Sequence, residues 1–266
     1  MLKKATLVFI GFLLIFASSC SKYNRLLKSS DYELKYRKAL EYYEKQKYQN
    51  ALGLLEELVT IFKGNEKGEK VMLYYAYCEY GLDDYILASY HFKNFVRTYP
   101  NSTFAEEAMY MNAYCYMLNS PGSTLDQSNT ISAIEEFQLF VTMYPNSNRV
   151  TECNTNIDVL RLKLETKAFD NAKLYYNMGD YKSSIVSLNN ILKDFPDTRY
   201  RDEVSFLALK SNYLLAINSI EEKKVERLKS TVDVYYKFID KYPKSEYLRQ
   251  AEQIFEACQK NINKKS

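Results

Sequence analysis

The same arrangement of apolar side chains recurs five times along the chain. Its clearest copy places five residues at offsets 0, 4, 7, 8 and 11: Ala88, Phe92, Phe95, Val96 and Tyr99. Residues three, four or seven positions apart share one face of an α-helix, so each copy predicts an amphipathic helix with one buried face. The other copies keep these offsets and begin at Ala51, Ala133, Ser184 and Thr231.

Four of these predicted helices end at a similar stop signal: an aromatic residue, Pro, a polar residue, and Ser or Thr. The signals occupy residues 99–102, 144–147, 195–198 and 242–245. Pro disfavours the helical conformation of the residue before it, and a Ser or Thr just after the Pro can cap the next helix. The first copy lacks the Pro and ends instead with Phe62, Lys63 and Gly64.

A second predicted helix precedes each of these helices. One copy has Tyr74, Tyr77, Cys78 and Gly81 at offsets 0, 3, 4 and 7, and a later copy repeats the spacing with Met111, Tyr114, Cys115 and Leu118. Gly179 is expected to take the left-handed conformation in one of the short turns between paired helices. Such units are typical of the tetratricopeptide repeat. We therefore predict an all-α, tetratricopeptide-like α-solenoid of five helical hairpins, each packed on its neighbours.

Three stretches depart from a regular repeat. Residues 119–132 are predicted to form an inserted loop in the third unit, and residues 221–229 to lengthen the turn of the fifth. Residues 149–178 are predicted to form one long helix with an apolar side of Ile157, Leu160, Leu164, Ala168 and Tyr175. This organisation predicts repeats one to three in residues 31–148, and the long helix with repeats four and five in residues 149–266.

The N-terminus is typical of a secreted bacterial lipoprotein. Two lysines precede an apolar run at residues 5–17, which is shorter than the roughly 20 residues that span a bilayer and suits a signal peptide at residues 1–19. Small residues lead to Cys20 and resemble a lipobox, which predicts that Cys20 carries fatty acyl chains such as palmitate. Simple signal-peptidase cleavage is the alternative. Residues 20–30 would then form a short tether.

The residues after Cys20 bear on location. Ser21 rather than Asp follows the Cys, and no acidic cluster comes next. By resemblance to lipoprotein sorting signals, these features favour the outer membrane and a periplasm-facing protein.

The composition favours protein binding over other activities. The chain has 26 Tyr, 14 Phe and no Trp, and its net charge is only +3 with interleaved signs, so nucleic-acid binding has little support. Tyr packs well in a core and also anchors bound peptides. Candidates for peptide contact on the first helices of the units are Tyr74, Tyr75, Tyr110, Tyr116, Tyr175 and Tyr176.

The sequence contains no recognisable catalytic or metal-binding constellation. His91 is the single histidine, and we expect it on the solvated surface. No Cys-x-x-Cys pair or Gly-rich phosphate loop is present, so we expect no metal, no cofactor and no enzymatic activity. The four further cysteines are expected to be buried free thiols, with one disulfide as the alternative in an oxidising periplasm: Cys78, Cys115, Cys153 and Cys258.

These features together resemble the BamD family of outer-membrane assembly lipoproteins. The resemblance covers residues 30–262 and is most telling at Tyr75-Ala76-Tyr77, Tyr110-Met111, Tyr144-Pro145-Asn146-Ser147, Tyr175-Tyr176 and Asp194-Phe195-Pro196-Asp197-Thr198. It implies no chemistry. It implies that the N-terminal repeats recognise the C-terminal strand signal of nascent β-barrel proteins, and that the C-terminal repeats dock to a periplasmic domain of a BamA-like barrel insertase.

The resemblance also implies roles for particular residues. The end of the first repeat contributes to substrate recognition in the family, which places Phe62 and Gly64 beside the tyrosines as substrate-peptide contacts. A family Arg-Asp pair faces the insertase, and Arg201 and Asp202 match it here. Arg201 could equally be a solvated charge at a helix start.

The sequence also leaves two other binding functions as alternatives. One is a periplasmic tetratricopeptide scaffold that coordinates cell-wall synthesis or envelope constriction, although those usually carry shorter arrays after a coiled coil, which is absent here. A nutrient-binding lipoprotein of the glycan-uptake class is another, but those chains are much longer and hold sugar-stacking Trp, which this chain lacks.

Overall fold

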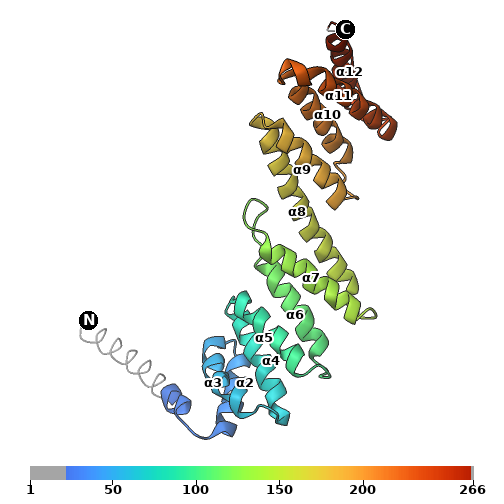
Figure 1. Ribbon diagram of the computed structural model, residues 1–266. Helices are drawn as coiled ribbons and strands as arrows, with labels where there is room; N and C mark the ends of the chain where they lie inside the picture. Colours follow the sequence, from blue (N-terminus) through green and yellow to red (C-terminus); the bar gives the residue numbers. More distant parts are fainter. Residues whose placement is uncertain (1–21, 265–266) are drawn as a thin grey trace, which may run out of the picture. The chain divides into compact units, whose positions relative to one another are not determined.

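The computed structural model describes residues 22–264, apart from the side chain of Glu66, and this part of the chain is helical without strands (Figure 1). Its helices after residue 30 are α2 (Tyr32–Glu44), α3 (Tyr48–Ile61), α4 (Glu66–Gly81), α5 (Tyr85–Thr98), α6 (Ala105–Leu118), α7 (Ser128–Met143), α8 (Val150–Asn177), α9 (Tyr181–Asp194), α10 (Arg201–Ile217), α11 (Glu221–Lys241) and α12 (Leu248–Asn263). Helices α2 to α11 pair in chain order as the five predicted hairpins. The all-α, tetratricopeptide-like fold class is thereby confirmed.

The repeated apolar pattern corresponds directly to the core. Offsets 0, 4 and 7 are buried in all five copies: Ala51, Leu55 and Leu58; Ala88, Phe92 and Phe95; Ala133, Phe137 and Phe140; Ser184, Leu188 and Ile191; Thr231, Tyr235 and Phe238. Offset 8 is partly exposed in each copy. These residues lie on the second helix of each hairpin, which presents a narrow buried stripe to its neighbours.

The four proline stops have nearly identical backbone conformations. The residue before Pro has φ and ψ of −127° and 61° at Tyr99, −126° and 61° at Tyr144, −122° and 70° at Phe195, and −127° and 61° at Tyr242. The Pro ring excludes the helical conformation there. Phe62 has no Pro after it and stays at −93° and 8°, and the chain turns instead through Gly64 at a φ of 79°.

Three hairpin turns use a left-handed residue at the same place. Gly179 has a φ of 81°, as predicted, while Gln46 and Asp83 take the equivalent positions with φ of 56° and 61°. Each lies two residues before the next helix. Only Gly adopts this conformation without steric cost, so the first two hairpins carry a small local strain that the fourth avoids.

A hydrogen bond across each proline-terminated hairpin recurs four times. The Ser or Thr of the stop signal donates its hydroxyl to a carboxylate on the first helix of the same hairpin: Ser102 to Glu69, Ser147 to Glu106, Thr198 to Glu165, and Ser245 to Asp202. The same hydroxyl oxygen accepts a hydrogen bond from the backbone N–H two residues further on. We call this pair of bonds the hairpin tie.

The chain divides into two compact units. The first comprises the described residues up to Pro121 together with Asp126–Leu160, and the second comprises Gly122–Leu125 and the residues from Arg161. The division falls inside α8, later than the boundary expected between residues 148 and 149. The long helix itself is confirmed, since α8 has 28 residues.

The two parts of α8 bury different faces. Leu160 is buried within the first unit, whereas Ala172 packs with Leu188 and Val204 in the core of the second. Tyr175 was expected on the apolar side but is exposed. It lies three positions after Ala172, beside the buried face, while the half-buried Tyr176 lies four positions after it.

The predicted longer turn at residues 221–229 was wrong. These residues form the first two turns of α11, where Glu221 and Glu222 suit the positive end of the helix dipole and Leu228 is fully buried. Helix α12 was not among the elements predicted from the sequence; it packs Ala251, Ile254 and Cys258 on the last hairpin and covers its apolar face. In residues 22–264, no helix combines the length and the apolar character that a membrane crossing needs.

The four described cysteines are buried free thiols, as predicted. Cys78 and Cys115 are fully buried at equivalent positions of α4 and α6. Burial raises the pKa of both thiols to about 12, and that of Cys153 and Cys258 to about 11. They are therefore protonated, unreactive core residues at neutral pH.

Candidate protein-binding surfaces

The predicted substrate contacts at the end of the first hairpin and on α4 belong largely to the core. Phe62 is only 7% exposed, and its ring lies edge-on to that of Tyr36, with centroids 6.0 Å apart. Tyr74 packs edge-on against Tyr43 at 4.7 Å. Gly64 alone is fully at the surface, and a Cβ added to it would meet no atom within 4 Å.

Tyr110 is buried by a contact with Glu152 and Arg149. It is 4% exposed, and its hydroxyl donates to Glu152 Oε1 at 2.7 Å, while the Arg149 guanidinium lies 4.2 Å from its ring centroid. Burial, followed by that hydrogen bond, raises its pKa. Tyr110 therefore links α6 to the start of α8 and has little surface to offer a peptide.

His91 is not the solvated residue that we expected. It is half-buried, with its ring edge-on to Tyr75 at 4.6 Å and to Tyr90 at 5.1 Å. Burial lowers its pKa, and the Asp84 carboxylate opposes this shift. Tyr75 thus fills the space beside the imidazole.

Cys20, the predicted lipidation site, lies outside the described residues.

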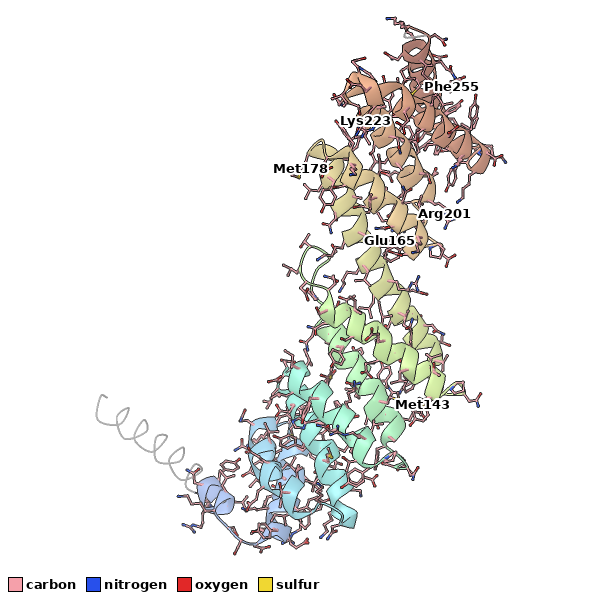
Figure 2. All side chains as sticks on the ribbon, in the orientation of Figure 1. Met143, Glu165, Met178, Arg201, Lys223 and Phe255 are labelled. Atoms are coloured by element: carbon pink, nitrogen blue, oxygen red, sulfur yellow. The ribbon has the colours of Figure 1, made fainter. Side chains whose placement is uncertain are left out.

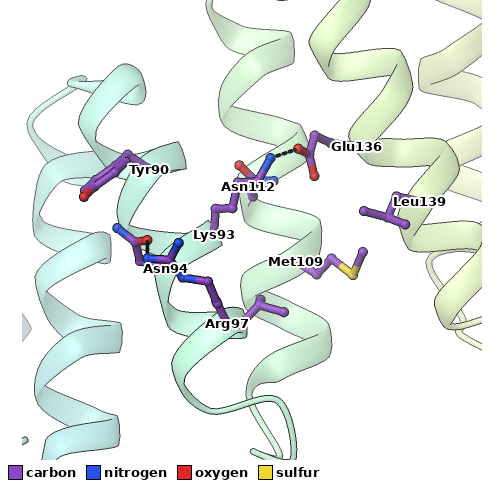
Figure 3. Close-up of a pocket in the computed structure, with 9 residues that line it drawn as sticks. Tyr90, Lys93, Asn94, Arg97, Met109, Asn112, Glu136 and Leu139 are labelled. Atoms are coloured by element: carbon purple, nitrogen blue, oxygen red, sulfur yellow. Dashed lines mark hydrogen bonds and ion pairs between the residues drawn. The ribbon is translucent and has the colours of Figure 1, made fainter.

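A groove that was not predicted from the sequence lies over α6, between α5 and α7 (Figure 3). Its volume is about 360 Å³, and its lining is Tyr90, Lys93, Asn94, Val96, Arg97, Met109, Asn112, Glu136 and Leu139. Tyr90 and Leu139 are 60% and 47% exposed, which is high for large apolar side chains on opposite walls. We call this surface the α5–α7 groove.

Asn112 gives the α5–α7 groove an unusual base. The residue is 2% exposed, and its Oδ1 is buried without a hydrogen-bond partner among the described residues. An unpaired buried amide oxygen costs about 1–3 kcal/mol, so native structures seldom retain one without a reason. The oxygen is itself shielded from solvent, so a bound N–H donor would reach it only after the Asn112 side chain turned toward the groove. Asn112 is the lone amide in the apolar sequence of α6, and this was the one sign of its position in the sequence.

The same groove carries positive charge. Lys93 donates to Glu136 at 2.5 Å across the groove, and this hydrogen bond raises the pKa of the lysine. Arg97 donates to the Asn94 side chain at 2.9 Å and has no carboxylate partner within the described part of the chain. The groove therefore combines apolar walls, a buried acceptor and an uncompensated guanidinium.

Arg201 and Asp202 lie at the start of α10 in the second unit, where Figure 2 labels Arg201. They line a cleft of about 370 Å³ together with Arg199, Lys241, Tyr242, Pro243, Lys244 and Ser245. Asp202 accepts the Ser245 hydroxyl at 3.1 Å as part of its hairpin tie, and Arg201 donates to the Pro196 carbonyl oxygen. Four cations against one engaged carboxylate leave this cleft strongly basic.

Comparison with known families shows to which family the chain belongs. Residues 29–228 and 165–265 match the profile of the YfiO family, which is described as an outer membrane lipoprotein. The chain belongs to the YfiO family. Its resemblance to BamD, seen in the sequence, is confirmed.

Two relatives carry the name outer membrane protein assembly factor BamD. The protein of Caulobacter vibrioides is 22% identical over 186 residues, which cover 70% of this YfiO family member and 61% of the relative. The protein of Rickettsia prowazekii is 21% identical over 180 residues, covering 68% and 72%. The match to the Caulobacter protein therefore spans less than two thirds of that protein's length.

Among solved structures, the TPR domain of P58(IPK) is similar to this YfiO family member. Sequence identity is 14%, the match covers 91% of this chain and 68% of that one, and the TM-score is 0.43. At this TM-score the likeness adds nothing to the fold assignment, which rests on the hairpins themselves.

Proposed function

We propose that this protein is a non-catalytic scaffold that helps to assemble β-barrel proteins in the outer membrane. Membership of the YfiO family and the names of the two BamD relatives support this function. Its location would be the periplasmic face of the outer membrane, held by acyl chains on Cys20. Two or three acyl chains anchor a protein stably, where one is marginal.

The α5–α7 groove is the proposed contact for nascent barrel segments, and the unpaired Asn112 Oδ1 is the observation that carries this part. Strands of outer-membrane barrels alternate apolar and polar residues, and their backbone N–H groups are unpaired before assembly. An extended segment would place apolar side chains against Tyr90 and Leu139, and would donate one N–H to Asn112 Oδ1 once that side chain turns toward the groove. Arg97 would receive an acidic side chain or a terminal carboxylate.

The five substrate contacts predicted from the sequence are one exposed glycine and four aromatic residues that are buried or partly buried: Gly64, Phe62, Tyr74, Tyr75 and Tyr110. Gly64 would offer its exposed turn as a direct contact. The four aromatic side chains would act mainly by positioning, because they pack in the core or in helix contacts.

The basic cleft at the start of α10 is the proposed docking site for a BamA-like insertase. Arg199, Arg201 and Lys244 would face an acidic patch of that partner. Asp202 would hold the cleft in shape through its hairpin tie to Ser245. Long-range attraction between opposite charges speeds such association and makes it sensitive to salt.

In-cell photocrosslinking tests the proposed function. A photoreactive residue at Arg201 should yield an adduct with the barrel insertase, and the same residue at the exposed Glu226 on α11 serves as the matched control. Adducts of Arg201 with cell-division or cell-wall proteins alone would favour a scaffold in cell-wall synthesis, and would contradict the assembly function.

A further inference from the structure

The stretch expected to act as a tether is partly folded. Residues 22–27 form a short helix. The Tyr23 hydroxyl donates to the Asn50 carbonyl oxygen at 2.9 Å, and the ring lies edge-on to Tyr42 with centroids 5.8 Å apart. Gly53 leaves room for this contact, because a Cβ there would lie 2.8 Å from the Tyr23 hydroxyl oxygen. The short helix is therefore docked on the first hairpin.

Docking of this helix creates a groove against α2 that we call the basal groove. Its volume is about 410 Å³, and its lining is Lys22, Arg25, Leu26, Ser29, Leu34, Lys38, Glu41 and Tyr42. Leu26, Leu34 and Tyr42 are partly buried, whereas Lys22 and Arg25 are exposed. The groove thus has an apolar floor and a cationic rim.

The charges of the basal groove are unbalanced. Glu41, its one carboxylate, accepts hydrogen bonds from Lys38 at 2.6 Å and from Lys45 at 2.7 Å, and these bonds lower its pKa to about 2. In residues 22–264, Lys22 and Arg25 form no ion pair. Both cations are therefore available to an anion from outside the chain.

The position of this groove in the chain indicates where the anion comes from. Lys22 follows Cys20 by two residues, which span at most about 7 Å of extended chain. Acyl chains on Cys20 would therefore hold the groove at the level of the lipid headgroups.

We propose that the basal groove binds the phosphate headgroup of an anionic phospholipid. Lys22 and Arg25 would contact the phosphate, and the apolar floor would cover the glycerol region beneath it. The inference rests on the proposed lipid anchor. With the short helix docked on the first hairpin, headgroup binding would fix the orientation of that hairpin on the membrane, which acyl chains on a loose tether could not do.

Vesicle cosedimentation tests headgroup binding without the anchor. The probe is the mature chain beginning at position 20 with Cys20→Ser, mixed with phosphatidylcholine vesicles that do or do not contain phosphatidylglycerol. We expect binding that requires phosphatidylglycerol, weakens with salt, and falls about tenfold or more in Lys22→Glu/Arg25→Glu, since each basic residue near an anionic surface contributes about 1 kcal/mol. The double variant Lys63→Glu/Lys70→Glu, outside the groove, should bind like the parent.

A fluorescence measurement reports on the groove directly. The chain contains no Trp, so Leu34→Trp on the groove floor gives a single signal, which should shift to shorter wavelength only with phosphatidylglycerol vesicles. Equal binding to phosphatidylcholine, equal loss in both double variants, or no loss in Lys22→Glu/Arg25→Glu would overturn the proposal. Mass spectrometry of Cys20 in the native protein tests the anchor separately, so the two failures are distinguishable.

Discussion

The hydroxyl of Ser147 donates a hydrogen bond of 2.6 Å to the carboxylate of Glu106, which ties the loop after α7 to α6. Because the same oxygen also accepts the Arg149 N–H at 3.1 Å, one side chain joins both helices of a hairpin and the start of the next. The proline stop signal therefore does more than end a helix, because its hydroxyl also links the hairpin to the start of the next helix.

Loss of this hydroxyl should weaken the first unit. Ser147→Ala leaves Glu106 without its donor, and a hydrogen bond to a charged group contributes about 1.5–3 kcal/mol. We expect the free energy of unfolding, measured in urea, to fall by about 1–2 kcal/mol. Ser147→Thr is the matched control and should retain most of the stability, because Thr198 makes the same tie in the fourth hairpin. Equal losses in both variants would refute this role.

Removing a glycine from one hairpin turn and adding one to another should change the free energy of unfolding in opposite directions. Gly179→Ala meets no steric neighbour, so its cost, about 1 kcal/mol, comes from the left-handed backbone alone. Gln46→Gly should stabilise the protein by up to about 1 kcal/mol for the same reason. Urea unfolding measures both. A stabilising Gly179→Ala would show that the turn is not left-handed in solution.

His91 should make stability depend on pH. Its folded pKa is lowered below 6.5 by burial, so the unfolded chain binds more protons as pH falls through that value, and the free energy of unfolding should decrease. His91→Gln should flatten this dependence. His91 is the single histidine of the chain, so its imidazole signal in an NMR titration is unambiguous. A midpoint at or above 6.5 would contradict the half-buried placement beside Tyr75 and Tyr90.

Asn112 should lower the free energy of unfolding but support binding in the α5–α7 groove. Asn112→Leu removes a buried oxygen that has no partner among the described residues, so we expect the free energy of unfolding to rise by about 1 kcal/mol. The same change should abolish crosslinks from the α5–α7 groove. Asn112→Ala, which also removes the oxygen but opens a cavity, separates the polar effect from packing. A large loss of stability in Asn112→Leu would show that the amide is a structural group instead.

Local periodicity explains which parts of the structure were predictable. Phe92 and Phe95 could be assigned to the core because burial on an amphipathic helix depends on spacing within that helix alone. The α5–α7 groove depends on three helices from two hairpins, so the chain positions of Arg97, Asn112 and Leu139 do not indicate that they meet. The cluster of tyrosines likewise could not show that Tyr110 is buried by a contact with α8.

Photocrosslinking from position 90 tests most directly whether the α5–α7 groove binds nascent barrel proteins. Tyr90 is the exposed aromatic wall of the α5–α7 groove, and the exposed Tyr236 of the second unit is the control position. A photoreactive residue at Tyr90 should capture unassembled outer-membrane barrel proteins in living cells, and Arg97→Glu should remove these adducts without unfolding the protein. Barrel-protein adducts that are as strong at Tyr236, or absent at Tyr90 in a well-expressed protein, would contradict the account.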